Sequence, residues 1–193
     1  MSSRIIISLT AAAVSLIFAS GCSHDSKKVS PDKTAAAAKE IGGTHYATIE
    51  FEKGATNLSP ASKAHLNSLT NRAHRTGRRI EEIKVLAWAD QEYPDKIHNA
   101  PTREVILAKE RAQSIKNYLE KELKEHEDID AFNMAKRPSL LGKLFENEDF
   151  KVKEAFEQSG ATATRLEDGS LSYSKASKAI VIIDYEENKT FTR

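Results

Sequence analysis

RIEEIKVLAWAD, residues 79–90, is the stretch of sequence that decides the fold. Successive side chains of a strand point to opposite faces of the sheet. The apolar residues here divide between the two faces, with Ile83, Val85 and Ala87 on one and Leu86 and Trp88 on the other. Apolar side chains on both faces are typical of a strand buried inside a sheet. We therefore predict a central strand that ends at Asp90.

Helical patterns lie on both sides of this strand. Upstream, Ser59-Pro60 predicts a helix start, with serine as the N-cap and proline at the first helical position, and Gly77 predicts its end. Downstream, residues 102–125 form the longest helical pattern. Its predicted buried stripe consists of Ala108, Ala112, Ile115 and Leu119. Each helix would connect two strands and pack on the sheet.

Three further strands complete the predicted sheet, at residues 45–51, 129–135 and 179–185, and the last is too apolar for an open edge. Between the last two, an insertion around residues 136–175 predicts one or two short helices over 140–158 and a hairpin with a type I′ turn at Asp168-Gly169. The order β-α-β-α-β, insertion, β predicts an α/β fold. Its mixed sheet would contain at least one parallel pair, with helices packed on it.

The amino terminus has the pattern of a secretory signal. Arg4 precedes an apolar run that is shorter than the roughly 20 residues of a membrane-spanning helix, and small residues precede Cys22, the only cysteine. Ala19-Ser20-Gly21-Cys22 resembles a bacterial lipobox, which implies cleavage before Cys22 and a lipid on its sulfur. The alternative is an uncleaved membrane anchor. We predict a signal peptide at 1–21, a lipidated flexible tether at 22–43 and one domain at 44–193.

Net charge excludes some classes of partner. The 29 Lys and Arg residues nearly balance 28 Asp and Glu residues, and removal of the signal with Arg4 takes the formal charge from +1 to zero. Such balance argues against nucleic acid and against a polybasic membrane patch. The six histidines show no metal-ligand spacing, and no phosphate loop or serine elbow occurs, so we predict no metal, no cofactor and no enzymatic activity.

Several motifs together resemble the OmpA-like peptidoglycan-binding domain, the domain of outer-membrane protein A and of the peptidoglycan-associated lipoprotein. The motifs are Ile49-Glu-Phe-Glu-Lys-Gly54, Leu58-Ser59, the strand-ending Asp90, Leu107-Ala-Lys-Glu-Arg-Ala112 and Tyr118-Leu119. The resemblance covers about residues 46–135 and resumes near 177. It implies that Asp90 and Arg111 bind peptidoglycan through the diaminopimelate of the stem peptide. An Asp can accept from its ammonium and an Arg can donate in pairs to its carboxylate.

Departures from the family pattern surround this pair. The family's Gly-His-Thr before the Asp is replaced by Ala87-Trp88-Ala89, and an Asn three residues before the helix Leu is Glu104. A Glu104 carboxylate would repel a ligand carboxylate, so the ligand or its pose could differ. The candidate pocket residues are Trp88, Ala89, Glu104 and Leu107. Ser23 after the lipidated cysteine favours the periplasmic face of the outer membrane, because an Asp there would signal inner-membrane retention by resemblance to lipoprotein sorting in enteric bacteria.

Other interpretations remain open. Asp90 and Arg111 could form only an internal salt bridge. Trp88 could stack on a ligand or pack under the long helix, and Lys178 could be a solvated charge. The domain could instead be a protein-interaction module of an envelope complex, with the insertion docking a partner through Phe145, Phe150 and Phe156. Those three rings could instead cover the edge of the sheet. A wall-cutting enzyme, which would release muropeptides, is the third class.

Overall fold

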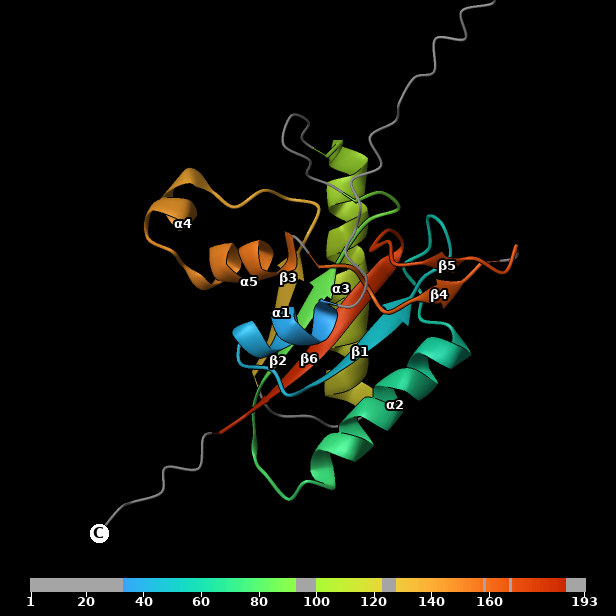
Figure 1. The fold of residues 1–193 in the computed structure, drawn as a ribbon, viewed down its shortest axis with the longest axis vertical. Coiled ribbons are helices and arrows are strands. Elements are labelled where there is room, and N and C mark those ends of the chain that lie inside the picture. The colour runs from blue at the N-terminus through green and yellow to red at the C-terminus, as the bar shows by residue number, and fades with distance from the viewer. Residues whose placement is uncertain (1–32, 93–99, 123–127, 158, 167, 187–193) are drawn as a thin grey trace, which may run out of the picture.

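The computed structural model describes residues 33–92, 100–122, 128–157, 159–166 and 168–186 (Figure 1). A four-stranded sheet has the order β1-β6-β2-β3. Its strands are β1 (His45–Glu50), β2 (Ile80–Ala87), β3 (Asp128–Asn133) and β6 (Lys178–Tyr185). Strand β6 runs antiparallel to both β1 and β2, whereas β2 and β3 are parallel. The predicted mixed sheet is confirmed, with β2 in its interior.

Strand β6 lies between β1 and β2, as its apolar sequence predicts. Every residue from Lys178 to Ile183 is buried. In register, Val181 lies opposite Ala47 of β1 and Val85 of β2. A strand paired on both sides satisfies its backbone hydrogen bonds within the sheet and leaves both faces to be covered by helices.

One face of the sheet is covered by α2 (Pro60–His74) and α3 (Thr102–Glu122), and Figure 1 shows α3 running behind the sheet. The Ser59 hydroxyl caps α2 by accepting from the Ser62 N–H at 3.0 Å, as predicted. The apolar cluster on this face includes Leu66, Leu69, Ile83, Val85, Ala112, Ile115 and Leu119. The predicted helical stripes are therefore core, and α3 is the crossover that makes β2 and β3 parallel.

The opposite face is covered by α1 (Thr34–Glu40) and by α5 (Glu148–Glu157), which follows the short α4 (Leu140–Leu144) in the insertion. Their cluster includes Ala37, Ala38, Leu86, Trp88, Val152, Phe156, Ile180 and Ile182. The three phenylalanines do not form one docking face, as the interaction-module alternative would require. Phe156 is buried in this core and Phe150 is partly buried, while Phe145 is exposed. The insertion thus covers the sheet with α5.

Helix α1 corrects the predicted domain boundary at residue 44. Ala37 and Ala38 are buried, and the Thr34 hydroxyl donates to the Gly160 carbonyl oxygen at 2.6 Å. Alanines carry too little hydrophobicity to stand out as an apolar stripe, but their small size lets a helix approach a sheet closely. The remainder of the predicted tether, 22–32, and the predicted signal peptide lie outside the described residues.

A matched pair of variants tests whether α1 belongs to the fold. Ala38→Asp would place a charge in the core and should lower the free energy of unfolding by at least about 2 kcal/mol. Ala36→Asp, on the exposed side of the same helix, should change it by less than about 0.5 kcal/mol. Urea denaturation measures both. Equal free energies of unfolding for the two variants would instead support the original prediction of a flexible tether up to residue 43.

The predicted hairpin in the insertion is present but its turn differs. Strands β4 (Thr164–Arg165) and β5 (Leu171–Ser172) pair antiparallel. The Gly169 N–H, at a residue with a φ of 82°, donates to the Leu166 carbonyl oxygen at 2.9 Å. This bond makes Gly169 the last residue of the turn, so Asp168 and Gly169 are not its two central residues and the predicted type I′ turn is wrong. The Asp168 carboxylate instead accepts from the N–H and hydroxyl of Ser170.

Within the described parts of the chain, every helix is too short or too polar to cross a bilayer.

Candidate functional site

Arg111 is the centre of the predicted site. It lies on the buried side of α3, and none of its surface is exposed. Its Nε donates to the Ala55 carbonyl oxygen at 2.8 Å, Nη1 to the Trp88 carbonyl oxygen at 3.1 Å, and Nη2 to the Glu52 carbonyl oxygen at 3.0 Å. Nη2 also donates to Asp90 Oδ1 at 2.6 Å. These bonds join the β1–α2 loop to the end of β2.

The remaining surroundings of the guanidinium fix its position further. Its carbon lies 5.0 Å from the centre of the Phe51 ring, a cation–π arrangement. An arginine side chain has five N–H donors, and four of them are used in the bonds above. Arg111 is therefore held by the protein itself, and its side chain does not reach solvent.

Asp90 is the partly accessible member of the pair, with 11% of its side chain exposed. Besides Arg111, Oδ1 accepts from the Ser177 hydroxyl at 2.9 Å, and Oδ2 accepts from the Gly54 N–H at 2.7 Å. Three segments therefore meet at one carboxylate: the loop after β1, the end of β2 and the residue before β6. Ser177 adopts a left-handed φ of 56°, which is strained for a serine.

The surroundings lower the pKa of Asp90. Burial alone would raise this pKa, but the hydrogen bonds from Arg111 and Ser177, the positive charge of Arg111 and the Gly54 N–H outweigh it. The Asp90 carboxylate is therefore ionised at neutral pH. Its stabilising contribution is complete above the ordinary carboxyl pKa and is lost as the pH falls through the lowered value.

The predicted pocket residues do not gather on an open surface. Only Glu104 joins the pair, where its Oε2 accepts from the Asp90 N–H at 3.1 Å. Ala89 and Leu107 are buried in a small cluster with Ala108 and Ala135, beneath the site. The Trp88 side chain points to the opposite face of the sheet, against Phe156 at 6.3 Å between ring centres. It packs with the insertion and not under the long helix.

Two lysines near the start of β6 were not anticipated as buried residues. Lys178 is 6% exposed, which corrects its reading as a solvated charge, and burial lowers its pKa against the opposing charges of Glu50 and Glu92. The Lys175 ammonium donates to the Phe156 and Ser159 carbonyl oxygens at 2.7 Å each. Lysines flanked by small polar residues in the sequence carry no signal of such burial.

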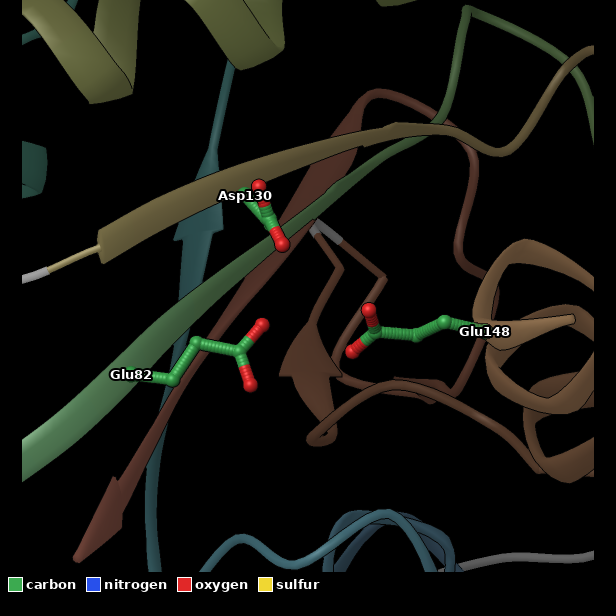
Figure 2. A group of neighbouring side chains, drawn as sticks. All are labelled: Glu82, Asp130 and Glu148. Carbon is green, nitrogen blue, oxygen red and sulfur yellow. The ribbon is translucent and has the colours of Figure 1, made fainter.

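A second cluster of charges lies on the face covered by α5 (Figure 2). Carboxylate oxygens of Glu82 from β2, Asp130 from β3 and Glu148 from α5 lie within 4.8 Å of one another. The buried Lys84 ammonium contacts Glu82 and lies 3.2 Å from Glu148 Oε1. Burial raises the pKa of Glu82 despite this ammonium. Because Lys84 already supplies a cation, the cluster is explained as the ionic contact that fixes α5 to the sheet.

The open edge of β1 borders a groove of about 530 Å³. It is lined by residues of β1 and α2 together with Thr162 and Ala163. Asp90 and Arg111 do not line this groove. The predicted pair and this groove are therefore different places on the molecule.

Comparison with known proteins adds little. No family model and no curated protein matches the chain. Among solved structures, the chain is similar to the peptidoglycan-associated lipoprotein from Burkholderia pseudomallei, with 13% identity and a TM-score of 0.37. The match covers 71% of this chain and 89% of that one.

Proposed function

We propose that this chain is an outer-membrane lipoprotein, anchored through Cys22 on the periplasmic face, that binds peptidoglycan non-covalently at the Asp90 edge of the sheet. The supporting observation is the contact between Asp90 and Arg111. These two motif residues lie 21 positions apart in the sequence and meet at 2.6 Å where three segments converge. A buried arginine that organises a partly exposed carboxylate is a preorganised arrangement for a cationic ligand group.

The ligand group best suited to Asp90 is the ammonium of diaminopimelate. A carboxylate oxygen has two lone pairs, and Oδ2 accepts one hydrogen bond, from Gly54. An ammonium could therefore be accepted at Oδ2 without breaking the contacts that hold Asp90. In this proposal Arg111 is a positioning residue, because its own donors are used within the protein. The ligand's carboxylate would then be bound by backbone N–H groups of the β1–α2 loop.

Glu104 restricts the pose of the ligand. Its Oε2 lies 3.1 Å from the Asp90 N–H, on the β2–α3 side of the site. A ligand carboxylate on that side would face another carboxylate, so the ammonium alone should approach from there. Glu104→Gln removes a negative charge that attracts this ammonium and should weaken sacculus binding several-fold. A tighter affinity of the variant would place the ligand carboxylate on the Glu104 side.

Sedimentation with purified sacculi tests the proposal. Asp90→Asn keeps the size of the side chain but loses the charge-assisted bond to the ligand, so binding should weaken at least about tenfold. Asp128→Asn, an exposed residue at the start of β3, is the matched control and should bind as wild type. Free diaminopimelate should compete for the wild-type chain.

Other results would support the rival classes. Wild-type binding by Asp90→Asn, or failure of diaminopimelate to compete, would remove the proposed site. Capture of envelope proteins without any sacculus binding would favour a protein-interaction module. Release of soluble muropeptides from the sacculi would show a wall enzyme.

A further inference from the structure

The short helix α4 carries an unusual concentration of exposed apolar side chains. Leu141, Leu144 and Phe145 are 67%, 72% and 75% exposed. They belong to the segment Lys136-Arg-Pro-Ser-Leu-Leu-Gly-Lys-Leu-Phe145, which we call the α4 tip. Figure 1 shows α4 at the outer edge of the molecule, away from the sheet. Large apolar side chains gathered on a protruding surface indicate a contact site.

The α4 tip is a defined structure and not a frayed loop. The Ser139 hydroxyl accepts from the Gly142 N–H at 2.9 Å, and the Phe145 N–H donates to the Leu141 carbonyl oxygen at 2.9 Å. The Asn147 N–H donates to the Gly142 carbonyl oxygen at 3.1 Å. A Cβ at Gly142 would lie 3.0 Å from both flanking side chains, Ser139 and Asn147, so the turn is tightly closed. The apolar residues are thus held outward by the local fold.

Charge distinguishes the tip from its surroundings. Lys136, Arg137 and Lys143 lie within it, against one acidic residue, the exposed Glu146, that directly follows it. The first acidic residues of α5 are already paired inside the protein: Glu148 with Lys84 at 3.2 Å and Asp149 with Lys153 at 2.6 Å. The α4 tip is therefore a basic and apolar surface on a chain whose total net charge is near zero.

We propose that the α4 tip docks on an anionic phospholipid surface. Apolar side chains flanked by cations are the composition of segments that lie in the membrane interface, where the apolar groups enter the acyl boundary and the cations meet lipid phosphates. The inference depends neither on Cys22 nor on Asp90, so it can fail or hold independently of peptidoglycan binding.

The shape of the tip favours lipid over a protein groove. A helix that binds in a groove uses anchors at positions i, i+3, i+4 and i+7, which need about two turns. Leu141, Leu144 and Phe145 supply positions i, i+3 and i+4, but α4 has 5 residues and ends before position i+7. A symmetric contact between two copies would bring two surfaces of the same positive charge together, which is unfavourable. A lipid surface imposes neither requirement.

Vesicle sedimentation tests the inference with the chain from Ser23 to Arg193, which lacks the acylated cysteine. All contacts described above lie within residues 33–186, so this chain retains them. It should sediment with phosphatidylcholine vesicles that contain phosphatidylglycerol, more weakly at high salt, and hardly with phosphatidylcholine alone. The triple variant Leu141→Ser, Leu144→Ser, Phe145→Ser should bind at least about tenfold more weakly.

The controls separate the tip from general surface effects. Leu166→Ser with Leu171→Ser changes two other exposed apolar residues, 48% and 54% exposed, and should leave vesicle binding unchanged. Lys136→Gln with Lys143→Gln should weaken binding and reduce its salt dependence without altering the apolar residues. Binding by the triple variant as strong as wild type would overturn the inference. So would self-association of the wild type that depends on these residues, without vesicle binding.

Discussion

Arg111→Met is expected to lower the free energy of unfolding by about 3–5 kcal/mol at neutral pH. The variant leaves the Asp90 carboxylate without the cation 2.6 Å away. It also removes the donors to the carbonyl oxygens of Glu52, Ala55 and Trp88. Urea denaturation measures the loss. The melting temperature should fall by on the order of 10 °C.

Two further variants identify the cause of this loss. Lys109→Met removes an exposed cation from the same helix and should cost less than about 0.5 kcal/mol. Adding Asp90→Asn to Arg111→Met should cost less than the sum of the single changes, because the unpaired charge is then gone. Strict additivity would mean that Asp90 and Arg111 do not act as a pair.

The effect of Arg111→Met should also depend on pH. The pKa of Asp90 is lowered in the folded protein, so its contribution is present above the ordinary carboxyl pKa of about 4 and is lost below it. The variant should differ most from wild type at neutral pH, and the difference should shrink as the pH falls through that range. A difference that is constant with pH would show that the lost carbonyl contacts dominate.

The sequence predicted the sheet well because its strands and helices have strong local signals. Ser59-Pro60 marks a helix start because the serine hydroxyl can cap the first backbone N–H groups and the proline ring favours the first helical position. Residues 179–185 are so apolar that only an interior position satisfies them, and β6 occupies one. The side of the sheet to which Trp88 points follows from alternation alone, but the element that covers it does not. That element, α5, comes from the insertion, whose position depends on tertiary contacts.

The failures concern residues whose burial depends on distant partners. Lys84 lies in an apolar strand yet is buried, because Glu82 and Glu148 neutralise it. Glu148 is 64 positions further along the chain, and no local pattern indicates the contact. The prediction of a flexible tether failed at the four alanines of α1 for a different reason. A run of small side chains shows no apolar stripe in the sequence, and its burial becomes evident only from the sheet on which it packs. The contact between Asp90 and Arg111 could be predicted from the sequence only through the motif resemblance.

Lys84→Met is expected to lower the free energy of unfolding by about 2–3 kcal/mol at neutral pH. The Lys84 side chain is 6% exposed and Glu82 19%, so removal of the cation leaves the largely buried Glu82 carboxylate without a counter-charge. Glu148 is 51% exposed, and its share is weakened by solvent, which keeps the loss below that of a fully buried pair. Lys53→Met, at an exposed position, should be nearly neutral.

The pH dependence of Lys84→Met separates charge from packing. Burial raises the pKa of Glu82 in the wild type, and loss of the ammonium should raise this pKa further. Because the pKa of Glu82 is raised in the folded protein, its carboxyl is mostly neutral below about pH 4 in the folded and unfolded states, so the variant should approach wild-type stability there. Its deficit should grow as the pH rises toward 7. Urea denaturation across this range measures the deficit, and one that is equal at both ends would mean that Lys84 fixes α5 through packing of its aliphatic chain.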